Sequence, residues 1–147
     1  MKKILAISSP GGHWTQIQRI APSFNGNEVV YVSTLKGYAN EVPNNIFYMV
    51  RDASRSNKIS LVVLFFQLLK IMYVEKPNIV ISTGAAPGLF AIIIAKLFGK
   101  KTIWVDSIAN SKKLSASGII AKYFTDLHLT QWKHLKTSKT QFFGTVL

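Results

Sequence analysis

The sequence contains no cysteine, so neither a disulfide framework nor a thiolate metal site is possible. Histidine is nearly as scarce, and His13, His128 and His134 do not form the His-Glu-x-x-His pattern of a zinc enzyme. We therefore expect neither a metal nor another cofactor. The lack of cysteine also suits a protein of the reducing cytoplasm.

Acidic residues are few, since six Asp and Glu stand against 18 Lys and Arg and leave a formal net charge of +12. The chain is nevertheless 48% hydrophobic, and its mean hydropathy is +0.22. A basic and apolar chain favours an anionic membrane surface, where each basic residue near the headgroups contributes roughly 1 kcal/mol. The alternatives are a basic soluble protein whose charge keeps it dispersed and a nucleic-acid binder. We predict a membrane partner and no nucleic acid.

A long apolar run is missing after the initial Met1-Lys2-Lys3. The run Ile4–Ile7 ends at the segment Ser8-Ser9-Pro10-Gly11-Gly12 and is too short for a secretory signal. We expect a first buried strand there instead.

Short apolar or β-branched runs alternate with helical patterns from end to end. We expect strands at residues 4–7, 28–33, 46–50, 78–83, 102–106 and 126–130. We expect helices at residues 13–20, 57–75, 87–98 and 115–124. This alternation predicts one Rossmann-like domain over residues 1–147, an α/β fold with a doubly wound parallel sheet. Such sheets bind ligands at the carboxyl ends of their strands, here the loops 8–13, 33–38, 83–88 and 106–113.

The longest expected helix is almost wholly apolar. Between Ile59 and Val74 only Ser60, Gln67 and Lys70 are polar, and these sixteen residues span roughly 24 Å against the ~30 Å apolar core of a bilayer. We therefore expect a helix that does not cross the membrane. It is either buried on both sides or, as we favour, its outer face meets lipid or a partner subunit. The candidate membrane contacts on this helix are Leu61, Phe65, Phe66, Leu69 and Lys70.

The helix at residues 87–98 is also apolar and is followed by further cations. Lys96, Lys100 and Lys101 lie at its end, where positive charge is favourable in itself. These three lysines could also reach lipid phosphates, and we add them to the candidate membrane contacts.

The segment Ser8–His13 joins the first expected strand to the first expected helix. Its two glycines let the backbone approach a ligand, and free amides at a helix N-terminus attract phosphate, so Ser9, Gly11 and Gly12 are candidate phosphate ligands. The segment is neither a Gly-x-Gly-x-x-Gly fingerprint nor a Walker loop, which argues against a dehydrogenase or an NTPase. His13 could take a proton from a sugar hydroxyl near neutral pH, or it could only cap the first helical turn.

Two further segments are expected on the same edge of the sheet. Ser82–Gly88 joins a strand to a helix through small residues, which makes Thr83 and Gly84 candidate acceptor ligands unless the segment is a plain tight connection. Asp106 and Ser107 end the fifth expected strand. Asp106 could orient a sugar hydroxyl or pair with His13, and Ser107 could bind the acceptor; alternatively, the two residues cap the next helix.

Four segments together resemble one family. They are Ser8–Gln16, Ser82–Pro87, Thr102–Ala109 and the pair Gln131-Trp132. Their order and spacing are similar to those of the acceptor-side subunit of the split UDP-N-acetylglucosamine transferase of dolichol-linked oligosaccharide synthesis, with its bacterial capsule and exopolysaccharide counterparts. The resemblance extends over essentially the whole chain.

The resemblance implies the N-terminal half of a two-domain glycosyltransferase of the GT-B type. Such a subunit would bind the membrane and a polyprenyl-pyrophosphate-linked sugar acceptor, while a separate donor-binding subunit holds the UDP-sugar. It would be active only with that partner, for which Gln131 and Trp132 are the candidate contacts. His13 would be the base or an acceptor-phosphate contact, with Asp106 as the second catalytic candidate.

We therefore expect a hexosyltransferase subunit of polysaccharide or oligosaccharide biosynthesis. Because this chain lacks the N-terminal membrane span of the eukaryotic members, its attachment is expected to be peripheral, on the cytoplasmic face of the cell membrane. The alternative is a non-catalytic anchor that recruits or activates a catalytic partner.

Overall fold

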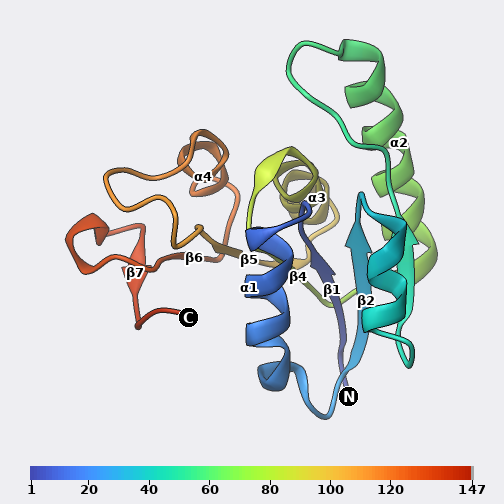
Figure 1. The fold of residues 1–147 in the computed structure, drawn as a ribbon, viewed down its shortest axis with the longest axis horizontal. Helices are drawn as coiled ribbons and strands as arrows, with labels where there is room; N and C mark the ends of the chain where they lie inside the picture. Colours follow the sequence, from blue (N-terminus) through green and yellow to red (C-terminus); the bar gives the residue numbers. More distant parts are fainter. Residues whose placement is uncertain (147) are drawn as a thin grey trace.

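The computed structural model describes residues 1–146 and contains a single parallel sheet (Figure 1). Its seven strands are arranged in the order β3-β2-β1-β4-β5-β6-β7, and every neighbouring pair is parallel. The strands are β1 (Lys3–Ile7), β2 (Glu28–Ser33), β3 (Ile46–Met49), β4 (Ile79–Ser82), β5 (Lys101–Val105), β6 (Leu127–Thr130) and β7 (Gln141–Phe142).

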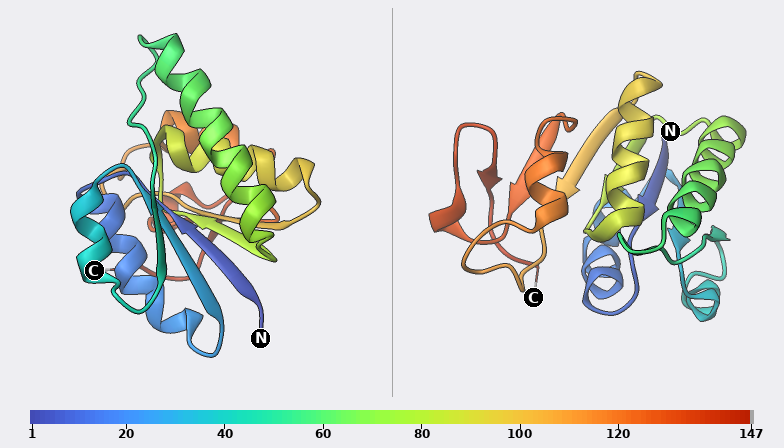
Figure 2. Two further views of the ribbon diagram at one scale, coloured as in Figure 1. Left: turned by 90° about the vertical axis from the view of Figure 1, so that its right-hand side faces the viewer. Right: turned by 90° about the horizontal axis from the view of Figure 1, so that it is seen from above.

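Helices cover both faces of this sheet, as Figure 2 shows from above: α2, α3 and α4 lie on one face and α1 on the other. The α-helices are α1 (Gly12–Ile20), α2 (Lys58–Glu75), α3 (Ala85–Leu97) and α4 (Ala116–Ala121). Short 3-10 helices are η1 (Ala21–Phe24), η2 (Lys36–Glu41) and η3 (Lys133–Leu135).

The core consists of two apolar layers, one on each face of the sheet. Alternate residues of β1 supply both layers, because successive side chains of a strand point to opposite faces. Leu5 and Ile7 pack with α2 and α3, whereas Ile4 and Ala6 pack with Trp14 and other residues of the α1 layer.

Local signals at the ends of α2 explain its boundaries. The Asn57 side chain accepts a hydrogen bond from the Ser60 amide at 3.0 Å and so caps the first turn. Lys76 takes a left-handed conformation with φ of 47° immediately before Pro77, and the helix ends there.

The predicted fold class is confirmed, because the sheet is parallel and doubly wound. The predicted helices and strands all occur, with ends displaced by a few residues; α3, for example, begins at Ala85 and not at residue 87. The strand β7 and the three 3-10 helices were not predicted, and η2 replaces the second half of the predicted loop 33–38. Elements this short contain too few residues to show a periodic pattern.

Within residues 1–146, no helix has both the length and the apolar character that crossing a membrane requires.

Candidate functional site

The candidate site lies where the strand order reverses. β1 is followed along the chain by β2 and β3 on one side, and β4, β5 and β6 then continue on the other side. In an open α/β sheet, the loops after the two strands at such a switch point border the ligand crevice. Here these are the loop from Ser8 to His13, after β1, and the loop from Thr83 to Gly84, after β4.

Two reciprocal hydrogen bonds join these loops. The half-buried His13 ring donates from Nδ1 to the Thr83 carbonyl oxygen at 2.7 Å. The Thr83 hydroxyl donates back to the His13 carbonyl oxygen at 2.6 Å. Nε2 of His13 makes no hydrogen bond with residues 1–146.

The glycines of the two loops have different uses. Gly84 has φ of +142°, and a Cβ there would lie 2.4 Å from His13 Cε1, so both its backbone and the His13 ring demand a glycine. Gly11 has φ of +77° and lies open, with its amide donating to the Tyr38 hydroxyl at 2.9 Å. The Tyr38 ring stacks on the Trp14 ring with 4.3 Å between the ring centroids, which holds Gly11 and the start of α1 together. The candidate ligand Gly12 is exposed beside Gly11, and Ser9 is half-buried.

Asp106 is in a different environment from His13. It is only 1% exposed, and within residues 1–146 no hydrogen bond joins it to His13. Its carboxylate accepts from Trp104 Nε1 at 3.0 Å, from the Ser115 amide at 3.0 Å and from the Ser115 hydroxyl at 2.6 Å. Ser115, and neither Asp106 nor Ser107, is the residue that caps α4. The carboxylate thus holds the cap in place and has its lone pairs largely occupied.

A buried amide network occupies the positions predicted for a partner interface. Gln131 is 2% exposed, so its side chain is not available to a partner in this conformation. Its Nε2 donates to Gln16 Oε1 and to the Asp106 carbonyl oxygen, while its Oε1 accepts from the Val146 amide at 2.7 Å. Ser107 belongs to the same network, because its hydroxyl accepts from Gln16 Nε2 at 3.2 Å.

Trp132, by contrast, is half-buried and hydrogen-bonds to the Ile108 carbonyl oxygen at 2.8 Å, which leaves part of its ring at the surface. The sequence motif at 131–132 thus combines an internal residue with a partly exposed one. A pattern of residue types alone cannot separate the two.

The outer face of α2 is largely apolar, with Lys70 as its exposed cation. Ser60 is buried, and the half-buried Gln67 accepts a hydrogen bond from the Arg51 amide. Phe66 is 60% exposed. The other exposed large apolar residues of this helix are Ile59, Val62, Tyr73 and Val74.

The candidate membrane residues of α2 divide into two groups. Phe66 and Lys70 are exposed, whereas Leu61, Phe65 and Leu69 are half-buried, and Phe65 and Leu69 pack against the core. Residues 59, 62, 66 and 73 follow one side of a 3.6-residue helix, but the buried side is equally apolar, so this period alone could not have selected the exposed residues. Figure 1 shows the first half of α2 projecting beyond the rest of the fold.

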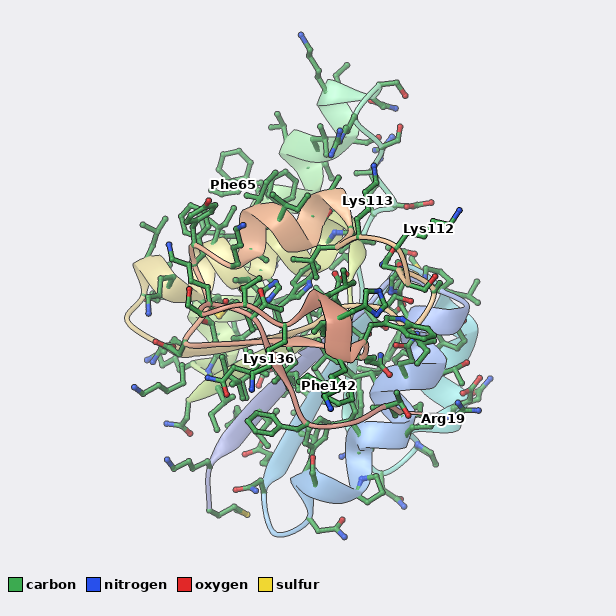
Figure 3. The ribbon with its side chains drawn as sticks, turned by 90° about the vertical axis from the view of Figure 1, so that its left-hand side faces the viewer. Arg19, Phe65, Lys112, Lys113, Lys136 and Phe142 are labelled. Carbon is green, nitrogen blue, oxygen red and sulfur yellow. The ribbon has the colours of Figure 1, made fainter. Side chains whose placement is uncertain are left out.

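The lysines assigned to the membrane lie at the other end of the sheet from His13. Lys101 begins β5, and the Lys101 amide donates to the Asn78 carbonyl oxygen just before β4, so this edge carries the starts of the strands. Lys96 pairs with Asp126 at 2.7 Å, and Lys100 is half-buried. Exposed cations on the His13 side of the fold include Arg51, Arg55 and Lys58 near the start of α2. Lys112 and Lys113, in the loop between β5 and α4, are exposed as well (Figure 3).

Comparison with known proteins assigns the family. Residues 39–146 match the family model described as "Oligosaccharide biosynthesis protein Alg14 like". This chain belongs to the Alg14-like family. The predicted resemblance to the UDP-N-acetylglucosamine transferase subunit is confirmed, and with it a function related to glycosyl transfer, while the capsule and exopolysaccharide counterpart stays a prediction.

Named relatives of the Alg14-like chain include two transferase subunits. The human UDP-N-acetylglucosamine transferase subunit ALG14 is 26% identical over an alignment 178 residues long, which covers 98% of this chain and 82% of the human protein. The subunit of the same name from Yarrowia lipolytica is 29% identical over 97 residues, which cover 60% of this chain and 45% of that protein.

Solved structures show the same fold in larger proteins. MurG from Acinetobacter baumannii matches with a TM-score of 0.80 at 15% identity, over 100% of this chain and 46% of MurG. A UDP-N-acetylglucosamine 2-epimerase from Rickettsia bellii matches with a TM-score of 0.72 at 17% identity, over 99% of this chain and 45% of the epimerase. The Alg14-like chain thus spans less than half of each of these proteins and has the fold of one half of a GT-B glycosyltransferase.

Proposed function

We propose that this Alg14-like chain is the acceptor-binding, membrane-anchoring subunit of a two-component glycosyltransferase. It would act with a donor-binding subunit to transfer a sugar from a UDP-sugar to a polyprenyl-pyrophosphate-linked saccharide. The observation that carries the proposal is His13, which sits at the switch point of the sheet with Nε2 unbonded among the described residues. A neutral imidazole nitrogen in such a crevice can accept the proton of an attacking sugar hydroxyl.

The same loop also suits a phosphate. Gly12 lies exposed at the start of α1, where helix amides favour anions, whereas the amide of the adjacent Gly11 already donates to the Tyr38 hydroxyl. Ser9 and the exposed Lys112 and Lys113 supply further donors on this side of the fold. These residues would hold the acceptor pyrophosphate beside His13.

A separate donor subunit is supported by the comparisons in two ways. The relatives are named as subunits, and the structural relatives are about twice the length that this chain matches. The UDP-sugar would therefore bind to the partner, and transfer would require both chains. Trp132, with its partly exposed ring, remains our candidate contact for that partner.

The membrane would lie against the outer face of α2. Its exposed Ile59, Val62 and Phe66 follow directly after Arg51, Arg55 and Lys58, so apolar side chains and cations adjoin. This combination suits an anionic bilayer surface, where apolar burial and electrostatic attraction add. We place the subunit peripherally on the cytoplasmic face of the cell membrane, in capsule or exopolysaccharide synthesis.

One observation favours a second reading, in which the chain is a non-catalytic anchor. Asp106 is consumed by internal hydrogen bonds, so it offers no second catalytic carboxylate beside His13. In that case the partner would supply all the chemistry.

Turnover of the assembled complex distinguishes the two readings. A catalytic His13 predicts that His13→Ala lowers kcat by roughly 10²- to 10⁴-fold at saturating acceptor. His13→Gln, which can hydrogen-bond but cannot hold a proton near neutral pH, should behave like His13→Ala if His13 is the base. If His13 only contacts phosphate, His13→Gln should recover near-normal kcat and the loss should appear in KM. An anchor predicts unchanged kinetics for both variants, and the single chain should show no turnover under any of these readings.

A further inference from the structure

We infer that Thr83 and Gly84 are positioning residues for His13, and that they fix its neutral ring in the Nδ1–H tautomer so that Nε2 is the working nitrogen. The role of Nε2 in catalysis rests on the proposed function, whereas the position and tautomer of the His13 ring are argued from the structure. It also changes the predicted role of Thr83 and Gly84, from acceptor ligands to residues that act through His13.

The tautomer follows from what the carbonyl group of Thr83 can do. A carbonyl oxygen only accepts, so the 2.7 Å contact requires a proton on His13 Nδ1. In a neutral ring the other nitrogen then carries a lone pair and no proton. Nε2 is therefore the only nitrogen that can accept a substrate proton or a donor's hydrogen bond.

The backbone of His13 is held by the same residue that orients its ring. The Thr83 hydroxyl donates to the His13 carbonyl oxygen at 2.6 Å, so the two residues are joined by two separate hydrogen bonds, one to the His13 ring and one to its backbone. A single contact would let the ring pivot about Cα, whereas the pair restrains both ends of the residue. Thr83 is itself fully buried, which leaves it little freedom to follow a displaced ring.

Gly84 provides the space in which the ring lies. A Cβ at this position would come within 2.4 Å of His13 Cε1 and 2.5 Å of Nδ1, distances that no packed side chain tolerates. The Gly84 amide donates to the Ser82 hydroxyl at 3.1 Å, which braces the turn from beneath. Any larger residue at 84 must therefore push the ring off the Thr83 carbonyl.

The turn that aims this carbonyl is strained. Gly84 has φ of +142°, and Ala85 follows with φ of +65°, a left-handed conformation that a residue with a Cβ adopts at a cost of roughly 1–2 kcal/mol. Strain of this kind persists where the surrounding structure enforces it, and it gathers at functional sites. We infer that the strained turn is retained because it directs the Thr83 carbonyl oxygen toward the His13 ring.

The other two histidines provide an internal reference. His128 donates from Nε2 to the Gly118 carbonyl oxygen at 2.9 Å, and His134 donates from Nε2 to the Ser111 carbonyl oxygen at 2.6 Å. Both therefore have the Nε2–H tautomer, opposite to that of His13. One spectrum of the chain contains the test residue and two references.

The experiment is long-range ¹H–¹⁵N NMR of the full chain with labelled histidine, at a pH where all three rings are neutral. We expect His13 to show a protonated Nδ1 and an unprotonated Nε2, while His128 and His134 show the reverse. A His13 ring with protonated Nε2, or with a mixture of tautomers, would overturn the inference.

Substitutions then test the two positioning residues. Gly84→Ala should abolish the Nδ1–H signature of His13 and leave His128 and His134 unchanged. Gly37→Ala is the matched control, since a Cβ there would meet no heavy atom within 4 Å. If Gly84→Ala unfolds the chain, Thr83→Val replaces it: loss of the hydroxyl should shift His13 toward mixed tautomers, and Thr83→Ser should restore the single form. An unchanged His13 spectrum in Thr83→Val would refute the role of that hydroxyl.

Turnover of the complex with its donor-binding partner gives the second readout. Gly84→Ala should lower kcat about 10²-fold at saturating acceptor, the order expected when a reacting group is displaced by about 1 Å. The loss should not add to that of His13→Ala, because both variants disable the same nitrogen. Normal kcat in a Gly84→Ala complex with a displaced His13 ring would refute the positioning role. Normal kcat in His13→Ala would instead refute the base role in the proposed function, while the NMR result still decides the geometry.

Discussion

Replacement of Asp106 separates a structural carboxylate from a catalytic one. The structure predicts that Asp106→Asn destabilises the chain and leaves the turnover of folded complexes unchanged. In the native chain the carboxylate accepts three hydrogen bonds, two of them at Oδ1 from Trp104 and Ser115 and one at Oδ2 from the Ser115 amide. Asparagine is of nearly equal size, so the comparison changes hydrogen bonding and charge with little change in packing.

The magnitude follows from counting donors. An asparagine that keeps its oxygen toward Trp104 turns its NH₂ group toward the Ser115 amide. Two donors then face each other where the native carboxylate accepts a hydrogen bond from that amide at 3.0 Å. A buried donor without a partner costs about 1–3 kcal/mol. Asp106→Ala removes the acceptor of all three bonds, and we expect a loss of about 3–5 kcal/mol, a large part of the roughly 5–15 kcal/mol that keeps a domain folded.

The assay is urea unfolding followed by circular dichroism, with transferase turnover of the complex measured on the same samples. The slope of free energy against urea should stay constant while the midpoint falls. Asp52→Asn is the matched control, because Asp52 is exposed and makes no hydrogen bond within the described part of the chain. A native midpoint combined with a loss of turnover greater than 10²-fold would refute the structural reading and return Asp106 to the catalytic site.

Three further outcomes are expected. Phe66→Ser should release the chain from anionic vesicles in a sedimentation assay at unchanged stability, whereas Phe65→Ser should lower stability by several kcal/mol because Phe65 packs on the core; equal vesicle binding by folded Phe66→Ser and wild type would contradict the assigned membrane face. Burial lowers the pKa of His128 despite its hydrogen bond to the Gly118 carbonyl, so the unfolded chain binds the proton first as pH falls. Its contribution to stability should be complete above the unfolded pKa of about 6.5 and be lost as pH falls through that value toward the lower folded pKa, a dependence that unfolding at several pH values should detect and that His128→Gln should reduce. Ala85→Gly should raise the free energy of unfolding by up to about 1 kcal/mol, since it relieves a positive φ, and a lower urea midpoint would contradict the assigned strain.

Local patterns were sufficient to predict the sheet and its edge. The alternation of strands with helices gives a parallel sheet, and small residues after β1 and β4 mark the loops that meet at the switch point. The same patterns could not assign partners to side chains. His13 meets Thr83, 70 positions away, and Gln131 meets Gln16, 115 positions away, because the crossing of the chain brings them together. The roles of Asp106 and Gln131 were therefore open until their neighbours were known.

The sequence also could not predict which side of α2 packs on the sheet. Its composition predicted an apolar helix, but both of its faces are apolar, so composition could not tell which side rests on the sheet. The loop before the helix decides this, because Arg51 donates to Gln67 through its amide and to Ser60 through its guanidinium group. Two of the three polar residues are thereby turned toward the protein, and apolar side chains such as Phe66 remain outside.

The amide network around Gln131 has a consequence for synthesis of the chain on the ribosome. β1 to β5 can pair in turn as they emerge, since each strand after β1 joins a neighbour made before it. The loop after β5 cannot form its final hydrogen bonds so early. The Gln16 side chain and the Asp106 carbonyl oxygen accept from Gln131 Nε2, and Gln131 Oε1 accepts from the Val146 amide, so these bonds form only after those later residues are made. The nascent chain can therefore pair its first five strands, and join the loops of His13 and Thr83, before the loop after β5 gains its final hydrogen bonds with Gln131.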